Sequence, residues 1–174
     1  MSKKLICPHC GSKNVVTHNG YYVCDSCKNS FGREAFSDKG IPMTEAVKGL
    51  RFRYGDVVSG SVRLRMIEEK DGTCLFEVYD ANEGGVDKVA DVLSAEEWKT
   101  LKEKLYNDLY LADWDREFIP NNDGKKVLDN NEWELGIDVS WDEVYEYTGY
   151  DAYPAYWKEL MKLIEPFFDR LEKK

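Results

Sequence analysis

The chain has 174 residues, 43% of them hydrophobic, and a formal net charge of −9 at pH 7. That length predicts one ordinary domain with a small appendage. Because no apolar run approaches the roughly eighteen residues of a membrane-spanning helix, the sequence excludes a protein that crosses a membrane with helices.

Two Cys-x-x-Cys pairs near the start of the chain predict a metal site. Thirteen residues separate the two pairs, which are Cys7 and Cys10, then Cys24 and Cys27. Four thiolates suit a tetrahedral zinc ion, and each two-residue gap lets the chain curl around one edge of the tetrahedron. Residues 14–18 and 21–23 are typical of short strands, and Asn19-Gly20 between them is favoured where both turn residues need positive φ. Residues 1–33 are therefore predicted to form a zinc ribbon with one structural zinc ion.

Two disulfides are the alternative interpretation of the four cysteines. The residues before Cys7 lack the apolar segment of a secretory signal, so we expect a cytoplasmic protein, and reducing cytoplasm favours metal over disulfide. A thioredoxin-type redox pair needs a strand-to-helix setting that neither pair has. With four cysteines available, His9 and His18 are not needed as ligands, and a closed shell of four sulfurs leaves no position for catalysis.

Charge is distributed unevenly along the chain. Residues 1–33 hold five of the 24 bases and one of the 33 acids, a balance of +4, and residues 34–174 hold the rest, a balance of −13. If nucleic acid is a partner, the ribbon must carry the contact, and its candidate contacts are Lys13, Lys28 and Arg33. The alternative is that acidity of the body only keeps a cytosolic protein soluble.

Residues 34–46 are interpreted as a linker because Gly40 and Pro42 interrupt any regular pattern, which leaves 47–174 as the body. Apolar and polar residues then alternate in three segments, a pattern typical of strands with one buried and one exposed face. These segments are 50–54, 62–66 and 74–78. Asp71-Gly72 marks a turn, so we expect an antiparallel meander.

A capping box at Ser94 and Glu97 predicts the start of a helix. An apolar stripe follows at three- and four-residue spacing and ends near residue 110. The stripe consists of Trp98, Leu101, Leu105 and Leu109. Residues 112–131, with a turn at 121–124, are interpreted as a surface excursion.

Two further strands and a last helix are predicted in the C-terminal part. Residues 133–139 alternate clearly and residues 143–147 more weakly. Pro154 suits the first position of a helix, and Pro166 predicts a kink or a restart near the end of that helix. The predicted fold class is α+β: a mainly antiparallel sheet with two helices on one face, preceded by the small zinc ribbon.

Residues 129–137 and 147–154 contain a Trp-x-Leu-x-Ile strand, a second strand and the motif Gly-x-x-Ala-Tyr-Pro. This pattern resembles a C-terminal signature found in many uncharacterised bacterial proteins, and the resemblance implies a bacterial origin without an established activity. The Cys pairs separately resemble zinc ribbons at the heads of many prokaryotic proteins, whose members mostly bind nucleic acid or protein. In structural terms, we expect Trp133 to point into the core and Gly149 to permit a turn.

Two places in the body are candidates for ligand binding. The arginines of the first two strands share the outer sheet face and could hold phosphate or carboxylate groups bidentately; they are Arg51, Arg53, Arg63 and Arg65. The alternative is a solvated face of ion pairs, with acids available at outward positions. These acids are Glu77, Glu132, Glu134 and Asp138. A ligand groove lined by Tyr147, Tyr150, Tyr153, Tyr156 and Trp157 is weighed against ordinary packing of these aromatics.

Other chemistry finds little support in the sequence. Cys74 is predicted to be an inert core thiol, and the acids of 113–123 lack the glycine that a calcium loop needs at its sixth position. There is no Gly-x-Ser-x-Gly, no phosphate-binding glycine loop and no histidine outside the ribbon to serve as a general base.

The sequence therefore favours a non-catalytic zinc-binding protein. We expect its ribbon to contact a macromolecule, either protein or nucleic acid, and its acidic body to mediate a further interaction. One alternative is an enzyme of unknown reaction with its site on the arginine face or in the aromatic groove. Another is an acidic interaction or inhibitor protein that presents carboxylates to a basic partner.

Overall fold

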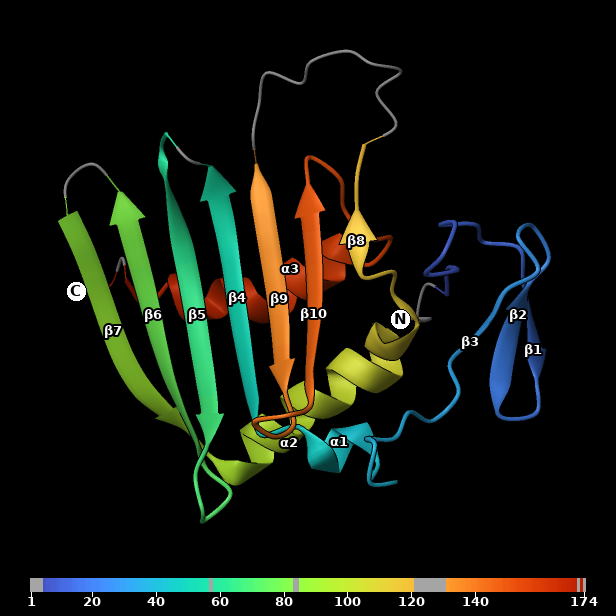
Figure 1. The fold of residues 1–174 in the computed structure, drawn as a ribbon, viewed down its shortest axis with the longest axis horizontal. Helices are drawn as coiled ribbons and strands as arrows, with labels where there is room; N and C mark the ends of the chain where they lie inside the picture. Colours follow the sequence, from blue (N-terminus) through green and yellow to red (C-terminus); the bar gives the residue numbers. More distant parts are fainter. Residues whose placement is uncertain (1–4, 57, 83–84, 121–130, 172, 174) are drawn as a thin grey trace.

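The structure is a computed structural model that describes residues 5–56, 58–82, 85–120, 131–171 and 173. A small sheet near the N-terminus lies beside one end of a larger sheet, and helices cover one side of the larger sheet (Figure 1). The small sheet has the order β1-β2-β3. Its strands are β1 (Val15–His18), β2 (Tyr21–Cys24) and β3 (Ser30–Phe31).

Within the described part of the chain, the larger sheet has seven strands in the order β7-β6-β5-β4-β9-β10-β8. Neighbours are antiparallel except β8 and β10, which are parallel. The strands are β4 (Gly49–Asp56), β5 (Gly60–Glu68), β6 (Cys74–Asn82), β7 (Gly85–Leu93), β8 (Glu117–Phe118), β9 (Glu132–Asp138) and β10 (Val144–Tyr150).

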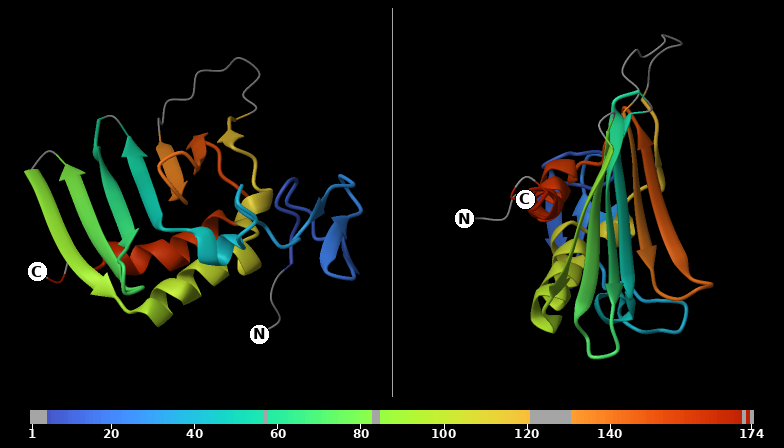
Figure 2. Two further views of the ribbon diagram at one scale, coloured as in Figure 1. Left: turned by 60° about the horizontal axis from the view of Figure 1, so that its bottom comes forward. Right: turned by 90° about the vertical axis from the view of Figure 1, so that its left-hand side faces the viewer.

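Two longer helices, α2 (Ala95–Glu103) and α3 (Trp157–Phe168), pack on the same face of the larger sheet (Figure 2). A π-helical turn at Lys104–Asp108 prolongs α2, a 3-10 turn covers Leu111–Asp113, and a short helix α1 covers Met43–Ala46. The predicted α+β class, with a mainly antiparallel sheet and two helices on one face, is confirmed. No helix in the described residues is both long enough and apolar enough to cross a membrane.

The core lies between the larger sheet and its two helices, and the predicted alternation puts the apolar side chains there. Phe52, Leu64 and Phe76 come from the three strands of the predicted meander, and each is at most 2% exposed. Phe167 of α3 packs edge-on against Phe76 with ring centroids 5.0 Å apart. No helix of the described residues lies on the opposite face of the sheet (Figure 2).

The capping box predicted at the start of α2 is present. The backbone N–H of Glu97 donates to the Ser94 hydroxyl at 3.2 Å, and the Ser94 N–H donates to the Glu97 carboxylate at 2.8 Å. Two N–H groups that the first turn would leave without partners are thereby satisfied.

Strand β7 is the longest element that the sequence did not predict; the short elements β3, α1 and β8 were not predicted either. Asp91 pairs in register with buried Phe76 and so occupies a position on the helix-covered face. A charge there breaks the apolar alternation that marks the other strands. It is tolerated because β7 is an edge strand, where Asp91 reaches Arg170 beyond the end of α3.

Helix α3 differs from its prediction at both ends. It begins at Trp157 instead of Pro154, whose carbonyl accepts a hydrogen bond from the Trp157 N–H at 3.0 Å. It also runs through Pro166 to Phe168 without a restart. Pro166 lies in the last turn, where a missing N–H removes only one helical hydrogen bond.

The predicted linker, residues 34–46, contacts the body. The Asp38 N–H donates to the Glu143 carboxylate of the body at 2.9 Å, and Met43 and Ala46 of α1 are buried. In the hairpin before it, positive φ falls on Gly20 (+84°) and not on Asn19. The turn predicted at 121–124 lies outside the described residues.

Gly149 has a different role from the one expected. It lies within β10 instead of a turn, and a Cβ there would collide with the indole of Trp133. The indole passes over this glycine, and its Nε1–H donates to the Ala152 carbonyl at 2.8 Å. The Trp and Gly-x-x-Ala parts of the C-terminal motif are therefore linked by one partly buried hydrogen bond.

We predict that Gly149→Ala lowers the free energy of unfolding by about 1–3 kcal/mol, because the added methyl group overpacks a filled site. Urea unfolding measures the change. Thr148→Ala, an exposed neighbour on the same strand, should cost less than about 1 kcal/mol. Equal effects of the two substitutions would contradict this account of Gly149.

A partly buried charge network links α2 to the sheet. Glu68 at the end of β5 accepts hydrogen bonds from Trp98 Nε1 at 2.7 Å, Lys102 Nζ at 2.9 Å and Lys48 Nζ at 2.7 Å. Burial raises the pKa of Glu68, but the three hydrogen bonds outweigh burial and hold that pKa below its ordinary value. Lys102 is only 6% exposed and depends on this carboxylate for its counter-charge.

We predict that Glu68→Gln destabilises the fold by about 3 kcal/mol or more at neutral pH, because Lys102 is left as an uncompensated buried charge. A depressed folded-state pKa contributes stability above the unfolded pKa, about 4.3 for Glu, and that stability is lost as the pH falls through the folded-state pKa. The difference from the parent protein in urea unfolding should therefore shrink at acidic pH. Exposed Glu69→Gln should change stability by no more than about 0.5 kcal/mol at either pH.

Candidate functional site

The four predicted cysteine ligands come together in the ribbon. Their sulfur atoms all lie within 4.8 Å of one another. The Sγ atoms of Cys7 and Cys27 are 3.6 Å apart, as are those of Cys10 and Cys24. A tetrahedral ion with metal–sulfur bonds of about 2.3 Å holds its ligands about 3.8 Å apart, whereas a disulfide needs about 2.05 Å. The cluster can therefore hold one metal ion, and the cysteines are not paired by disulfides.

The environments of the four thiols differ. Burial raises the pKa of Cys7 to about 12, whereas hydrogen bonds to Cys24, chiefly from the Cys27 backbone N–H, lower the pKa of Cys24 to about 6. Cys10 is exposed at the outer side of the cluster. Because a metal binds thiolates, a bound cation would remove the protons that burial otherwise favours.

The histidines lie outside the cluster, as expected. The ring of His18 stacks on Tyr21 with centroids 5.1 Å apart, and His9 Nδ1 lies 4.0 Å from the Asp115 carboxylate. Neither histidine belongs to the metal-binding group of the described residues.

One side of the ribbon packs on the body. Phe31 of β3 and Tyr22 of β2 contact the ring of Tyr110, with centroids 5.2 Å and 5.8 Å away. Gly32 fits between the tyrosines, because a Cβ there would lie 2.7 Å from Tyr22 and 3.3 Å from Tyr110. Its N–H donates to Asp113 at 3.0 Å. The ribbon is thus seated on the segment that follows α2.

A second anchor joins the start of the ribbon to the start of α3. The Tyr156 hydroxyl accepts from the Ile6 N–H at 3.2 Å and donates to the Ile6 carbonyl at 2.8 Å. Cys7, the next residue, has no exposed surface. One of the four metal ligands therefore lies in the contact between ribbon and body.

The other side of the ribbon is exposed. Tyr21 and Tyr22 are consecutive on β2, so their side chains point to opposite faces. On the outer face, the Arg33 guanidinium lies 3.6 Å from the centre of the Tyr21 ring, and His18 stacks on the same ring. The other two candidate contacts, Lys13 and Lys28, are exposed beside the Cys pairs.

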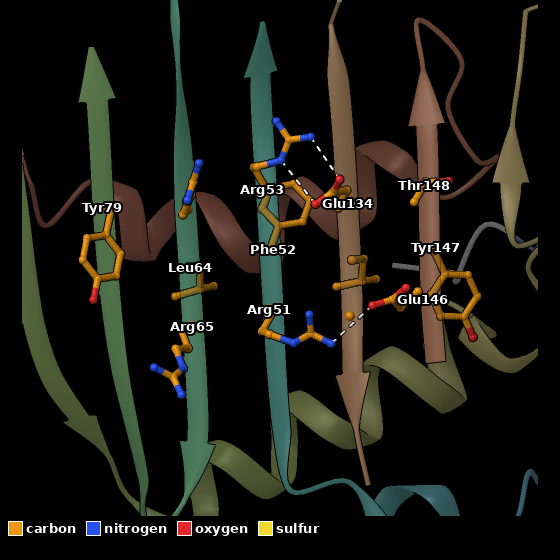
Figure 3. A pocket seen from close by; sticks show the side chains of 13 residues that line it. Arg51, Phe52, Arg53, Leu64, Arg65, Tyr79, Glu134, Glu146, Tyr147 and Thr148 are labelled. Carbon is orange, nitrogen blue, oxygen red and sulfur yellow. Dashed lines mark hydrogen bonds and ion pairs between the residues drawn. The ribbon is translucent and has the colours of Figure 1, made fainter. Parts of the chain in front are cut away.

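The arginines of the sheet face divide into two groups. Arg51 of β4 pairs with Asp138 at 2.9 Å and Arg53 with Glu134 and Glu132 at 3.1 Å. Figure 3 shows both arginines reaching from β4 toward β9 and β10, with Arg51 near Glu146. The predicted ion-pair face is thus present for β4.

The arginines of β5 have no such partners. In the part of the chain that the structure describes, no carboxylate oxygen lies within 4.0 Å of Arg63 or Arg65. Glu77, expected as an acid partner, instead pairs with Lys88 at 2.7 Å. A hollow of about 400 Å³ extends over the face and includes all four arginines in its lining.

Sequence reasoning missed several parts of this hollow. Tyr79, Glu146 and Thr148 also line it. Their outward positions follow from the alternation of β6 and β10. The strand order that brings β10 near β4, however, cannot be inferred from a single sequence. Gly136, also in the lining, makes room for the Arg51 side chain, since a Cβ there would lie 2.7 Å from Nη2.

The five aromatics weighed as a groove differ in their surroundings. Tyr147 and Tyr156 are buried, and Trp157 packs among Phe52, Tyr54 and Trp133. Tyr150 and Tyr153 remain 37% and 39% exposed.

Two smaller expectations concern Cys74 and the acidic loop. Cys74 is fully buried, and burial raises its pKa to about 12, which suits an inert thiol.

Asp113 accepts a hydrogen bond from the Gly32 N–H, and Asp115 faces His9, so these acids contact the ribbon. Asp123 lies outside the described residues.

Comparison with protein-family models, with curated proteins and with solved structures gives no match. The resemblance of the C-terminal motif therefore remains an expectation, and the function is argued from the site alone.

We predict that Cys10→Ser abolishes stoichiometric metal binding, because it removes one ligand at an exposed position without opening a core cavity. Loss of metal should unfold the ribbon, since binding supplies about 10–16 kcal/mol in comparable peptides. Trypsin should then cleave at Lys13 and Lys28 faster than in the metal-loaded protein.

Ser26→Ala is the matched control, since Ser26 lies in the second Cys pair and its hydroxyl contacts only Ser12 among the described side chains. It should keep both the metal and the protease resistance. Full resistance of Cys10→Ser would contradict a ribbon that depends on metal.

Proposed function

We propose that this chain is a non-catalytic, cytoplasmic zinc-binding protein in which one structural zinc ion, held by Cys7, Cys10, Cys24 and Cys27, shapes a ribbon that contacts nucleic acid. The acidic body would mediate a further interaction with protein. Zinc is the metal that four thiolates at tetrahedral spacing most commonly hold, and its closed shell has no place for a substrate.

The observation that carries the proposal is the stack on the outer face of the ribbon. His18 and Arg33 both lie against the Tyr21 ring. The opposite face of the ribbon is covered because it packs on the body. Aromatic and guanidinium groups offer stacking surfaces to unpaired bases, and nearby lysines attract the phosphate backbone. Residues 1–33 carry this cationic surface on an otherwise acidic chain.

The further interaction of the body is supported by Trp141. This side chain is 93% exposed, next to Asp142 in the loop between β9 and β10. Tryptophan is among the residues that most often anchor protein interfaces, and it is seldom left in water on a monomer.

The test is fluorescence anisotropy with a labelled single-stranded oligonucleotide. We expect the intact chain to bind more weakly as salt rises, with a slope of roughly −2 in log K against log salt for three phosphate contacts. The triple variant K13A/K28A/R33A should lose this binding while it retains its metal.

Two controls separate the ribbon from net charge and from the body. K39A/K70A/K158A removes three exposed lysines outside the ribbon and should bind as the parent protein does. Trp141→Ala should also leave oligonucleotide binding unchanged. Absent or salt-independent binding by the intact chain would contradict the nucleic-acid contact and leave a protein as the partner of the ribbon.

A further inference from the structure

The open face of the larger sheet carries four arginines as a block on two neighbouring strands. In the register of β4 and β5, Arg51 lies opposite Arg65, and Arg53 lies opposite Arg63. Like charges at directly opposed positions of an antiparallel pair are destabilising. These two opposed arginine pairs therefore destabilise the sheet unless negative charge lies nearby.

Of these four arginines, only those of β4 form ion pairs with carboxylates of the described residues, and Glu77 acts on Arg65 from a longer distance. Arg51 donates three hydrogen bonds to Asp138, at 3.3 Å, 3.1 Å and 2.9 Å, and Arg53 donates two to Glu134, at 3.3 Å and 3.1 Å. In Figure 3, Arg51 points toward β9 while Arg65 points the other way. The carboxylates of β9 and β10 are thus on the far side of β4 from Arg65.

The acid opposite Arg65 is already engaged. Glu77 on β6 is the register partner of Arg65. Its carboxylate accepts from Lys88 at 2.7 Å and from the Tyr79 hydroxyl at 2.7 Å. Over the residues that the structure describes, Arg63 and Arg65 therefore have guanidinium groups without a carboxylate inside 4.0 Å.

Both of these side chains line the hollow of about 400 Å³. That volume falls within the range of about 300–1,000 Å³ that small-molecule sites occupy. Residues two apart on a strand are separated by about 7 Å, so Arg63 and Arg65 can each address a different oxyanion group of one ligand. The planar guanidinium binds such groups through two parallel N–H donors.

We propose that Arg63 and Arg65 bind a small anion with two phosphoryl groups, a diphosphate, in this hollow on the open sheet face. A phosphoryl group carries more negative charge than a carboxylate and so compensates both arginines better. Arg51 and Arg53 form the opposite wall, where the acids of β9 and β10 outnumber them, so the anion binds from the β5 side of the hollow. This site lies on the body and is independent of the ribbon and its metal.

Inorganic pyrophosphate is the probe, and isothermal titration calorimetry on the full-length, metal-loaded chain is the measurement. We expect binding with one site per chain that weakens as salt rises. R63Q/R65Q should weaken it by about tenfold or more, the effect of losing charged hydrogen bonds. R63K/R65K keeps the charge but lacks the planar guanidinium group. Its affinity for pyrophosphate should lie between those of the parent protein and R63Q/R65Q. Succinate, which carries two carboxylates, should bind more weakly than pyrophosphate.

K70Q/K158Q is the matched control. It removes the same charge from two exposed lysines, one before β6 and one on α3, and should leave pyrophosphate binding unchanged. Absent binding to the parent protein, equal weakening by both double variants, or equally tight binding of succinate would overturn the proposal.

Thermal unfolding without anion provides a second, independent readout. If Arg63 and Arg65 serve a ligand, R63Q/R65Q should have a Tm equal to or above that of the parent protein, because two like-charge pairs are removed. Pyrophosphate should raise the Tm of the parent protein and not that of the variant. A lower Tm for the anion-free variant would assign the arginines to the fold and overturn the proposal.

Discussion

Four cysteine sulfurs within 4.8 Å of one another form the constraint on which the N-terminal part of the structure depends. A ribbon of some thirty residues buries too little apolar surface to hold itself together, and thiolates at this spacing repel unless a cation lies between them. The cation would act beyond the ribbon as well. Cys7 is fully buried next to Ile6, whose backbone is bonded to Tyr156, so the metal, the ribbon and the start of α3 share one contact.

The body has the opposite organisation, with one face of the sheet in the core and the other in water. Helices α2 and α3 cover the inner face (Figure 2), and the ion pair of half-buried Glu68 with buried Lys102 links α2 to the end of β5. The outer face is charged but not uniformly neutralised, since Arg53 has two acid partners and Arg63 has none among the described residues. This unequal compensation is the observation from which we propose an anion site on the open face.

Local patterns were predictable wherever one physical cause dominates. Metal-ligand spacing placed Cys7 to Cys27, alternation placed β4, β5 and β6, and the capping box placed the start of α2. What failed depended on tertiary contact. Asp91 breaks the apolar alternation of β7, and its ion-pair partner Arg170 lies far along the chain, so the sequence did not indicate this strand. Gly149 was expected in a turn, although it makes room for Trp133 within a strand. The division of the arginines followed from strand order, which a single sequence does not contain.

The central claim is that one zinc ion bound by four sulfurs organises the ribbon. X-ray absorption spectroscopy at the zinc edge of the purified chain, together with the metal-to-protein ratio, tests this claim most directly. The account predicts one zinc per chain and a first shell of four sulfur atoms at about 2.3 Å. A shell that contains nitrogen or oxygen in place of a sulfur, or a chain that folds without stoichiometric metal, would contradict it.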